Sequence, residues 1–599
     1  MAQGLPSSEA TGQSDDRAFL GVARSFTGRR WVARASDERL ALALAQRHAL
    51  PDILARSLAS RGIGLGDAEA FLAPKLREVL PDPYRLKDME AAALRMVVAV
   101  MGAERVAVFG DYDVDGATSS ALLMRFSQAV GCSLRLYVPD RLREGYGPNA
   151  PAMRQLAEEG IKLVVCVDCG ATAHEALAAA KEAGLDVIVL DHHATEAALP
   201  PAFALVNPNR IDEDGAYGNL AAVGVTYLFV IAVNRALREA GWYGVSRREP
   251  DLLGLLDLVA LGTVCDVVKL TGLNRAFVTQ GLRVMAKRGN AGIAALAAVA
   301  GCRPVLDAFS AGFQLGPRVN AGGRVGEADL GAKLLFTQDA SVAQTLAQHL
   351  HALNEERRMI EAQILADADE MVFLEDSPMV FASSERWHPG VIGIVASRLK
   401  DKYHRPAIVV ALQGEIGKGS GRSVSGVDLG AHVLAARQAG LLVNGGGHAM
   451  AAGLTVERGK LGALQEFLAG RIGRQIEAAP LVPSLALDGL ATAGGLHVEF
   501  LEQMACLAPF GAGNPEPRFA LAGCRVVRAN VVGEKHVSVI VSQGGASLRG
   551  IAFRAMDSDL GLALLSLKGR PCHLAGHARL DEWQGQRRAQ IHIDDAAEG

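Results

Sequence analysis

Short apolar runs alternate with amphipathic stretches between residues 105 and 289, and this pattern constrains the fold more than any other feature of the chain. The runs that we interpret as buried strands are Val106–Phe109, Leu134–Val138, Leu163–Val167 and Val187–Leu190. Segments with helical spacing lie between them. Because strands that alternate with helices form parallel sheets with helices on both faces, we predict a parallel, doubly wound α/β domain here.

The rest of the chain predicts further domains, since 599 residues are too many for one hydrophobic core. Residues 341–371 carry apolar residues at a helical period, which indicates a long helix between two lobes. We expect a second α/β unit over 372–478 and, from short strands with turns, a small β-barrel over 479–599. Residues 1–36 lack periodicity and predict an N-terminal tail, while residues 37–340 hold a helical segment and the first α/β domain.

Composition excludes several classes of protein. The chain is 50% apolar and 21% charged, which is typical of globular proteins. A net charge of -4 argues against a polycation, so any nucleic-acid site must be a local groove. Eight irregularly spaced cysteines and the lack of a signal-like start predict a soluble, cytoplasmic protein. The longest apolar stretch, Leu252–Val268, is interrupted by Asp257 and Asp266, so we expect no membrane span.

Acidic and histidine residues directly follow three of the predicted strands. They are Asp111, Asp113 and Asp115 after the first strand, Asp168 after the third, and Asp191, His192 and His193 after the fourth. A further apolar segment, Leu255–Val264, runs into Asp266. Because the carboxyl ends of parallel strands border one crevice, these groups can converge although they lie far apart in sequence. Such convergence of carboxylates would be strongly repulsive without cations.

Carboxylates combined with one or two imidazoles suit Mn²⁺ or Mg²⁺ better than a structural Zn²⁺. A shared carboxylate can hold two ions about 3.5–4 Å apart, which is an arrangement for phosphoryl transfer. A lone Asp at a strand end is usually a helix cap or a turn former. The combination of three alternating Asp residues with a later Asp and an Asp-His-His triplet favours a metal centre.

Two other motifs carry less chemistry. Cys166 and Cys169 have the spacing of a redox or zinc motif, but no second cysteine pair accompanies them, so we interpret them as packing residues. The stretch Gly414–Ser420 suggests a phosphate-binding loop, yet Lys418 is followed by Gly419 instead of Ser or Thr. An ATPase function is therefore not indicated.

The sequence around the acidic cluster resembles the DHH phosphoesterase superfamily and, within it, the RecJ family. The segments that resemble the DHH motifs are Gly110–Ser119, Val167–Gly170, the triplet Asp191–His193 and Gly262–Asp266. The segments that resemble RecJ beyond the metal motifs are Leu315–Arg324, Trp387–Gly393, Gly419–Ser423, Gly445–Gly453 and Pro509–Pro517. The resemblance covers roughly residues 37–590 and implies a DHH domain, a long connecting helix, a DHHA1 domain and a C-terminal OB-fold barrel.

The resemblance also implies an activity and partners. RecJ-like proteins are expected to be single-stranded-DNA-specific 5′–3′ exonucleases that release 5′-mononucleotides by two-metal hydrolysis, with Mn²⁺ or Mg²⁺, in DNA recombination and repair. A helicase and a single-stranded-DNA-binding protein are expected partners, and the chain is expected to be a monomer.

Carried over by position, the resemblance assigns roles to individual residues. The expected metal ligands are Asp113, Asp115, Asp168, His192 and Asp266, with Asp168 as the bridge and Asp111 as an additional ligand or a neighbour of the ligands. His193 would donate to the scissile phosphate. The expected DNA-binding residues are Arg422 with the turn formed by Gly446, Gly447 and His448, and Arg318 or Arg324 near the 5′ end. The glycines could instead form only a tight turn, and the last two arginines could be interlobe ion-pair residues.

Two other functions compete with this one. A DHH phosphodiesterase acting on oligoribonucleotides or cyclic dinucleotides would typically lack the segment around Phe510–Pro517, which is present here. A catalytically silent scaffold that binds DNA should have lost metal ligands, and this chain keeps them. Among the C-terminal aromatic residues, Phe519 and Phe553 could stack on bases or belong to the core.

Overall fold

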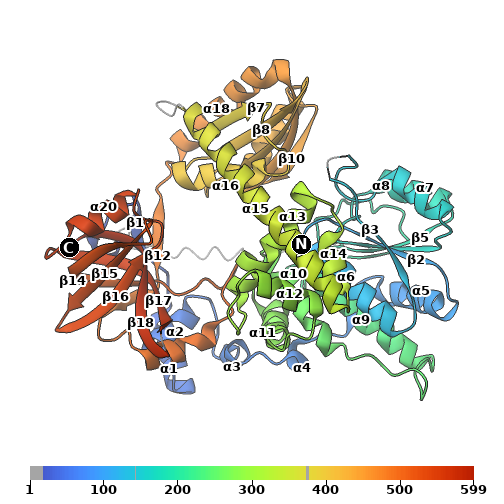
Figure 1. Cartoon of the computed structure of the whole chain (residues 1–599), viewed down its shortest axis with the longest axis horizontal. Coiled ribbons are helices and arrows are strands. Elements are labelled where there is room, and N and C mark those ends of the chain that lie inside the picture. Colours follow the sequence, from blue (N-terminus) through green and yellow to red (C-terminus); the bar gives the residue numbers. More distant parts are fainter. Residues whose placement is uncertain (1–17, 142, 373–376, 584) are drawn as a thin grey trace, which may run out of the picture. The chain divides into compact units, whose positions relative to one another are not determined.

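The structure, a computed structural model, describes residues 18–141, 143–372, 377–583 and 585–599 (Figure 1). The chain forms two compact units. The larger unit consists of Pro74–Leu481 with Pro509–Asn514, and the smaller of Met1–Ala73, Val482–Ala508 and Pro515–Gly599.

The larger unit contains a five-stranded sheet in the order β3-β2-β4-β5-β6, and all the pairings of this sheet are parallel. Its strands are β2 (Val106–Gly110), β3 (Leu134–Tyr137), β4 (Leu163–Val167), β5 (Asp186–Leu190) and β6 (Ala204–Val206). The four predicted strands are confirmed. The sequence missed β6, because three residues are too few to show a pattern.

Side chains alternate between the two faces of this sheet, as the pleat requires. Val108 and Val167 face helices α5 (Met89–Met101), α6 (Val114–Ala129) and α9 (Ala222–Glu239) in one core. Phe109 and Cys166 face α7 (Ala150–Glu158) and α8 (His174–Glu182) in the other, where Cys169 is also buried. The doubly wound prediction is therefore confirmed, and both cysteines are packing residues.

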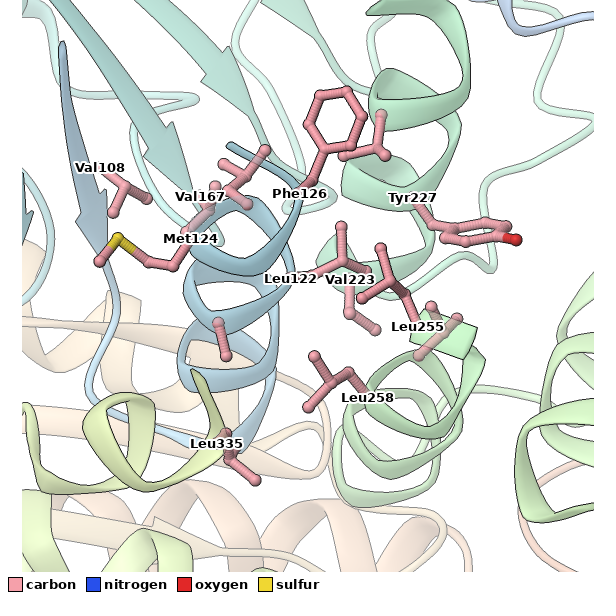
Figure 2. Close-up of a cluster of buried hydrophobic side chains, with 14 of the residues drawn as sticks. Val108, Leu122, Met124, Phe126, Val167, Val223, Tyr227, Leu255, Leu258 and Leu335 are labelled. Carbon is pink, nitrogen blue, oxygen red and sulfur yellow. The ribbon is translucent and has the colours of Figure 1, made fainter. Parts of the chain in front are cut away.

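Figure 2 shows the first of these cores, where sheet residues meet Leu122 and Phe126 of α6 and Val223 of α9. Full burial of each such side chain stabilises the fold by roughly 1.5–3 kcal/mol relative to exposure. The core continues into α10 (Leu256–Cys265), so it fixes that helix against the sheet. The apolar segment before Asp266 is thus a buried helix rather than another strand.

A helical region follows α10 in the larger unit. It contains α11 (Gly272–Ala286), α12 (Ala291–Val299), the π-helical turn η4 (Ser310–Leu315), α13 (Gly316–Val325) and α14 (Leu330–Phe336). The predicted long helix is confirmed as α15 (Ala340–Met371), which begins where Asp339 accepts hydrogen bonds from the backbone N–H groups of Ser341 and Val342. In the ranges that the structure describes, no helix combines the length and the apolar character needed to cross a membrane.

The second α/β domain has a mixed sheet in the order β10-β11-β9-β8-β7. Its strands are β7 (Val380–Ser384), β8 (Ala407–Gln413), β9 (Ile416–Arg422), β10 (Asn444–His448) and β11 (Ala451–Glu457). Only β7 and β8 pair in parallel. Its helices are α16 (Ile392–Tyr403), α17 (Leu429–Gln438) and α18 (Leu461–Ala478).

The glycine-rich stretch of this domain differs from the prediction of a turn. Gly446, Gly447 and His448 belong to strand β10, which pairs with β11. A Cβ on Gly430 of α17 would lie 2.8 Å from the carbonyl oxygen of Gly447, so the glycines let this helix pack directly on the strand. Arg422 is the last residue of strand β9.

The smaller unit contains a closed five-stranded barrel, because β14 pairs with both β15 and β17. The strands are β14 (Phe519–Val532), β15 (His536–Gln543), β16 (Ala546–Ala552), β17 (Pro571–Trp583) and β18 (Gln586–Glu598). Helix α20 (Asp559–Ser566) connects β16 to β17, and β16 pairs with β18 in parallel. The predicted barrel is confirmed. Phe519 is buried within it, whereas Phe553 is exposed.

The N-terminal region differs from the predicted tail. Strand β1 (Arg30–Ala33) pairs in parallel with β12 (Ser484–Leu487), and the side chain of Trp31 is fully buried. Helices α1 (Glu38–His48) and α2 (Asp52–Ala59) also belong to the barrel unit, not to the first α/β domain. A four-residue strand has no detectable periodicity, so the sequence did not reveal it. Residues 1–17 of the predicted tail lie outside the described residues.

Candidate metal centre

The metal-ligand candidates lie at the carboxyl edge of the first sheet. Asp111 follows β2, Asp168 follows the neighbouring strand β4, and His192 lies two residues after β5. Strand β2 has β3 on one side and β4 on the other, so this edge is the point where the strand order reverses. Asp168 has φ +60°, a left-handed conformation that costs free energy in a non-glycine residue and is often found at functional sites.

The start of helix α6 brings two further carboxylates to this edge. Asp113 caps the helix, and its Oδ1 accepts hydrogen bonds from the backbone N–H groups of Asp115 (2.9 Å) and Gly116 (3.1 Å). A Cβ on Gly116 would lie 2.4 Å from the carbonyl oxygen of Asp111. Only glycine therefore allows the chain to turn from β2 into α6 this closely.

Asp115 is held in place by the N-terminus of α9. Its two carboxylate oxygens accept hydrogen bonds from the backbone N–H groups of Ala222 (2.6 Å) and Val223 (2.9 Å). The N-terminal end of a helix stabilises negative charge, so α9 both orients this carboxylate and favours its ionised form. A Cβ on Gly262 would lie 2.3 Å from Thr118 Oγ1, so glycine is needed for α10 to approach α6.

His192 lies at the middle of the cluster. Its Nε2 is 3.4 Å from Asp168 Oδ1, 3.6 Å from Asp266 Oδ2 and 4.0 Å from Asp115 Oδ2. Buried polar atoms of folded proteins nearly always have hydrogen-bond partners. Here the buried atoms without such a partner are Asp111 Oδ1, Asp168 Oδ1, His192 Nε2 and Asp266 Oδ2. Four unpartnered ligand atoms in one acidic cluster fit bound cations.

The ligand atoms form adjacent groups, each spanning less than 4.8 Å. One group is Asp111, Asp113 and Asp168, and another is Asp115, His192 and Asp266. A third group joins Asp168 to His192 and His193. Hard carboxylate oxygens with an imidazole are a donor set for Mn²⁺ or Mg²⁺. The predicted acidic and histidine residues are thus positioned to bind metal.

The electrostatics of the cluster also favour cations. Burial, with added repulsion from Asp113, raises the pKa of Asp111 to about 8 and that of Asp266 to about 7. Burial and neighbouring carboxylates raise the pKa values of Asp115 and Asp168 well above their usual range. Divalent cations would reverse this effect, because they neutralise the charges that repel one another.

His192 and His193 have opposite pKa shifts. Burial and the charge of His193 lower the pKa of His192, which favours the neutral imidazole that a metal requires. Burial opposes charge on His193, but the hydrogen bond and the charge of Asp191 outweigh it and raise its pKa. The Nδ1–H of His193 donates to Asp191 Oδ1 at 2.7 Å. Its other ring nitrogen remains available for a phosphate oxygen.

A pocket of about 230 Å³ opens beside the acidic cluster. Its lining residues are Asp111, Tyr112, Asp113, Arg141, Tyr146, His193, Asn320 and Arg324. The Arg141 guanidinium lies 5.0 Å from the centre of the Tyr112 ring, a cation–π contact. Burial and the charges of Arg141 and Arg357 lower the pKa of Arg324 to about 10, so it stays charged at neutral pH.

The predicted DNA-binding residues divide into two groups. Arg324 lines the pocket. Arg318 does not line it, and its Nε donates to His351 Nδ1 at 3.1 Å. Residues six positions apart on a helix point to different faces, which explains the separation of these two arginines on α13. Gly446, Gly447 and His448 are also absent from the residues that line the pocket.

Sequence reasoning missed several residues of the site. Arg141 and Tyr146 come from the loop after β3, and the hydroxyl of Tyr146 donates to the carbonyl oxygen of Asp168 at 3.1 Å. This loop carries no motif, but it follows a predicted strand, so the same strand-end rule could have identified it. Asn207 was also missed. Its Nδ2 donates to the carbonyl oxygen of His193 at 2.8 Å and so holds the backbone of the histidine pair.

A parallel sheet with carboxylates and an Asp-His-His triplet at its carboxyl edge defines a metal-dependent phosphoesterase of the DHH type. In agreement, residues 105–263 match the DHH family, N-terminal domain, residues 376–474 the DHHA1 domain and residues 487–595 the RecJ OB domain.

Comparison with individual proteins narrows the class further. A protein of Salmonella typhimurium (strain LT2) named single-stranded-DNA-specific exonuclease RecJ is 36% identical, over 91% of this chain and 96% of the relative. The protein of the same name in Escherichia coli (strain K12) is also 36% identical, over 91% and 96%. The crystal structure of RecJ in complex with Mn²⁺ from Thermus thermophilus has a TM-score of 0.79 at 30% identity, over 94% of this chain and 79% of that one. The chain belongs to the RecJ family, and it is a metal-dependent nuclease.

Proposed function

We propose that this chain is a single-stranded-DNA-specific exonuclease that degrades DNA from the 5′ end and releases 5′-mononucleotides with two bound ions. The observation that carries the proposal is the convergence of four buried, unpartnered ligand atoms between adjacent carboxylate groups. Single-stranded DNA as the substrate is supported by the names of the relatives from Salmonella and Escherichia, which match this chain over nearly their full length. A role in DNA recombination and repair within the cytoplasm is part of the same proposal.

The residues of the centre have separate tasks in hydrolysis. Bound Mn²⁺ or Mg²⁺ would supply Lewis acidity toward the phosphate and a water molecule. Asp168 belongs both to the group with Asp111 and Asp113 and to the group with His192 and His193, so it would be the ligand that two ions share. Asp111, Asp113, Asp115, His192 and Asp266 complete the ligand set. Asp115 is fixed by backbone N–H groups of α9, which keeps the site in place before substrate binds.

His193 would hold a proton beside the candidate metal ligands. Asp191 keeps its charge, because hydrogen bonds from His193 and from backbone N–H groups outweigh the effect of burial and lower its pKa. The carboxylate therefore fixes the imidazole through Nδ1. In the protonated ring, the Nε2–H would donate to an oxygen of the scissile phosphate as negative charge develops there.

Arginines beside the centre would hold the DNA phosphates. Arg141 and Arg324 line the pocket together with Asp111 and Asp113. Burial and the charge of Arg141 lower the pKa of Arg422, so these two guanidinium groups act on each other. Neighbouring guanidinium groups attract a phosphate, and each can bind it with two hydrogen bonds. The roles of Gly446, Gly447 and His448 in DNA binding stay predictions, as do a helicase and a single-stranded-DNA-binding protein as partners and the monomeric state.

Product analysis tests the proposal against its alternatives. Single-stranded DNA and RNA oligonucleotides labelled at the 5′ or the 3′ end are incubated with Mn²⁺, Mg²⁺ or chelator. We expect the 5′ label to appear at once in mononucleotides from DNA, only with metal present. Preference for short RNA or for cyclic dinucleotides would support a small-substrate phosphodiesterase. Binding without any hydrolysis would indicate a silent scaffold.

A further inference from the structure

Two phenylalanines outside the pocket form an exposed stacked pair. The side chains of Phe309 and Phe313 are 52% and 72% exposed. Their ring centres lie 5.1 Å apart with 27° between the planes. Aromatic rings usually contribute to a core, and an exposed cluster of apolar groups commonly marks a binding surface. This pair is therefore a candidate binding surface.

The local backbone holds the pair outward. The π-helical turn η4 buries Ser310, Ala311 and Leu315, and these residues fix its inner face. Asp307 accepts hydrogen bonds from the backbone N–H (2.7 Å) and the hydroxyl (2.8 Å) of Ser310. The Asp307 carboxylate is thus bound to the first residue of the turn. The backbone that carries the two rings is therefore held in place from both its start and its inner face.

The same turn is fixed to the helix that carries a metal-ligand candidate. The thiol of Cys265, the last residue of α10, donates to the carbonyl oxygen of Ala311 at 3.5 Å. A Cβ on Gly316 would lie 2.5 Å from the sulfur of Cys265, so glycine permits this contact. Asp266 follows Cys265 directly. The phenylalanine pair and the metal centre therefore lie on one continuous piece of the first domain.

One arginine, Arg318, contacts the segment that carries the aromatic pair. Arg318 donates to His351 and, at 2.6 Å, to the carbonyl oxygen of Gln314, and in the described parts of the chain no carboxylate forms an ion pair with it. The charges of Arg288 and Arg318 both act on the thiol of Cys302. Glu355, which also acts on Arg318, is paired with Arg358 at 3.1 Å. The hydrogen bond to Gln314 holds the positive charge of Arg318 against the backbone of the residue that follows Phe313.

We propose that Phe309 and Phe313 form a stacking platform for an unpaired base of the substrate strand, with Arg318 attracting a neighbouring phosphate. Aromatic faces together with guanidinium groups are the combination that binds single strands without sequence preference. The platform and the metal centre would then bind successive parts of one strand. This inference rests on the proposed nuclease function and adds a site outside the catalytic pocket.

The test measures binding of fluorescent (dT)12 in the Asp168→Ala background, where the strand stays intact. Base stacking on one aromatic residue predicts that Phe313→Ala raises Kd roughly five- to a hundredfold. Phe313→Trp should bind like the parent, because a larger aromatic face stacks at least as well. Phe203→Ala is the matched control, since Phe203 is 50% exposed on the same domain but lies after β5.

Abasic substitution identifies the contact itself. A single abasic site moved along (dT)12 should weaken binding by the parent at one or two adjacent positions, and the Phe309→Ala/Phe313→Ala variant should lose this dependence. Equal binding of (dT)12 by this variant and the parent would overturn the platform, and would indicate that a protein covers the pair. If the active chain cleaves no DNA while the aromatic dependence of binding holds, the proposed function fails and the platform stands.

Discussion

The Nδ1 of His193 lies 2.7 Å from Oδ1 of Asp191, a buried carboxylate that also accepts hydrogen bonds from the backbone N–H groups of Ala171 (2.9 Å) and His192 (2.7 Å). Asp191 is not among the grouped ligand atoms, so its position indicates that it orients His193. A fixed imidazole is needed for proton donation, because the reacting nitrogen must lie within hydrogen-bond distance of the phosphate oxygen.

Asp191→Asn should therefore lower kcat on single-stranded DNA by about a hundredfold or more, with little change in Mn²⁺ affinity. The variant keeps the size of the side chain but removes the charge that stabilises the imidazolium. Steady-state kinetics and Mn²⁺ titration on the same sample check this. Asp214→Asn, on the exposed surface, is the control. A loss of metal binding equal to the loss of kcat would make Asp191 part of the ligand shell instead.

Metal removal should make stability depend on pH. In the chelated protein the pKa values of Asp111 (about 8) and Asp266 (about 7) are raised above their ordinary value, so the folded state binds protons that the unfolded state has released. Their contribution to stability is present at low pH and is lost as pH rises through 7 and 8. The melting temperature in chelator should fall from pH 6 to pH 9, and Mn²⁺ should raise it most at pH 9.

The control for this experiment is Asp111→Asn, which removes one of the shifted carboxyl groups. We expect a weaker pH dependence of its melting temperature in chelator. If the unsubstituted chain shows the same melting temperature at both pH values, with and without Mn²⁺, the carboxylates are not destabilised as described.

Arg422 should bind substrate without affecting the metals. Its Nη1 donates to Ser420 Oγ (3.1 Å) and to the carbonyl oxygen of Gly421 (2.8 Å). Arg422→Ala should raise KM about ten- to a hundredfold with unchanged Mn²⁺ affinity, since a charge-assisted hydrogen bond contributes roughly 1.5–3 kcal/mol. Arg422→Lys should recover only part, because an ammonium group lacks the planar fork. An unchanged KM with a lowered melting temperature would make Arg422 a structural residue.

Trp31 should stabilise the barrel unit. Its indole Nε1 donates to Asp595 Oδ2 at 2.9 Å, and its ring is buried with Leu485 and Ala520. Trp31→Ala should lower the free energy of unfolding of this unit by about 3–5 kcal/mol, whereas cleavage of a short oligonucleotide at saturation should persist. Calorimetry and kinetics on one preparation check this. An unaltered thermogram would show that the N-terminal strand does not contribute to the barrel.

Strand β1, which carries Trp31, shows what could not be predicted from the sequence. Patterns predicted the sheet and its acidic edge, because runs such as Leu163–Val167 are long enough to show and parallel strands bring their ends together. Strands β1 and β6 have only four and three residues, so no periodicity reveals them. The loop with Arg141 and Tyr146 carries no motif, and its place after a predicted strand is the one sequence signal that it borders the pocket. The closeness of Arg318 and Arg324 in the sequence also did not show that the two side chains lie on different faces of α13.

Asp168 would join two groups of ligands into one two-ion centre, and the number of Mn²⁺ ions bound per chain distinguishes this arrangement from a single-ion site. Equilibrium titration followed by electron paramagnetic resonance counts the ions in the parent chain and in Asp168→Ala, with hydrolysis of single-stranded DNA measured in parallel. We predict two ions in the parent, a loss of tight binding in the variant, and hydrolysis that falls to background. Near-normal hydrolysis by Asp168→Ala in Mn²⁺, or a single ion in the fully active parent, would contradict the two-ion assignment.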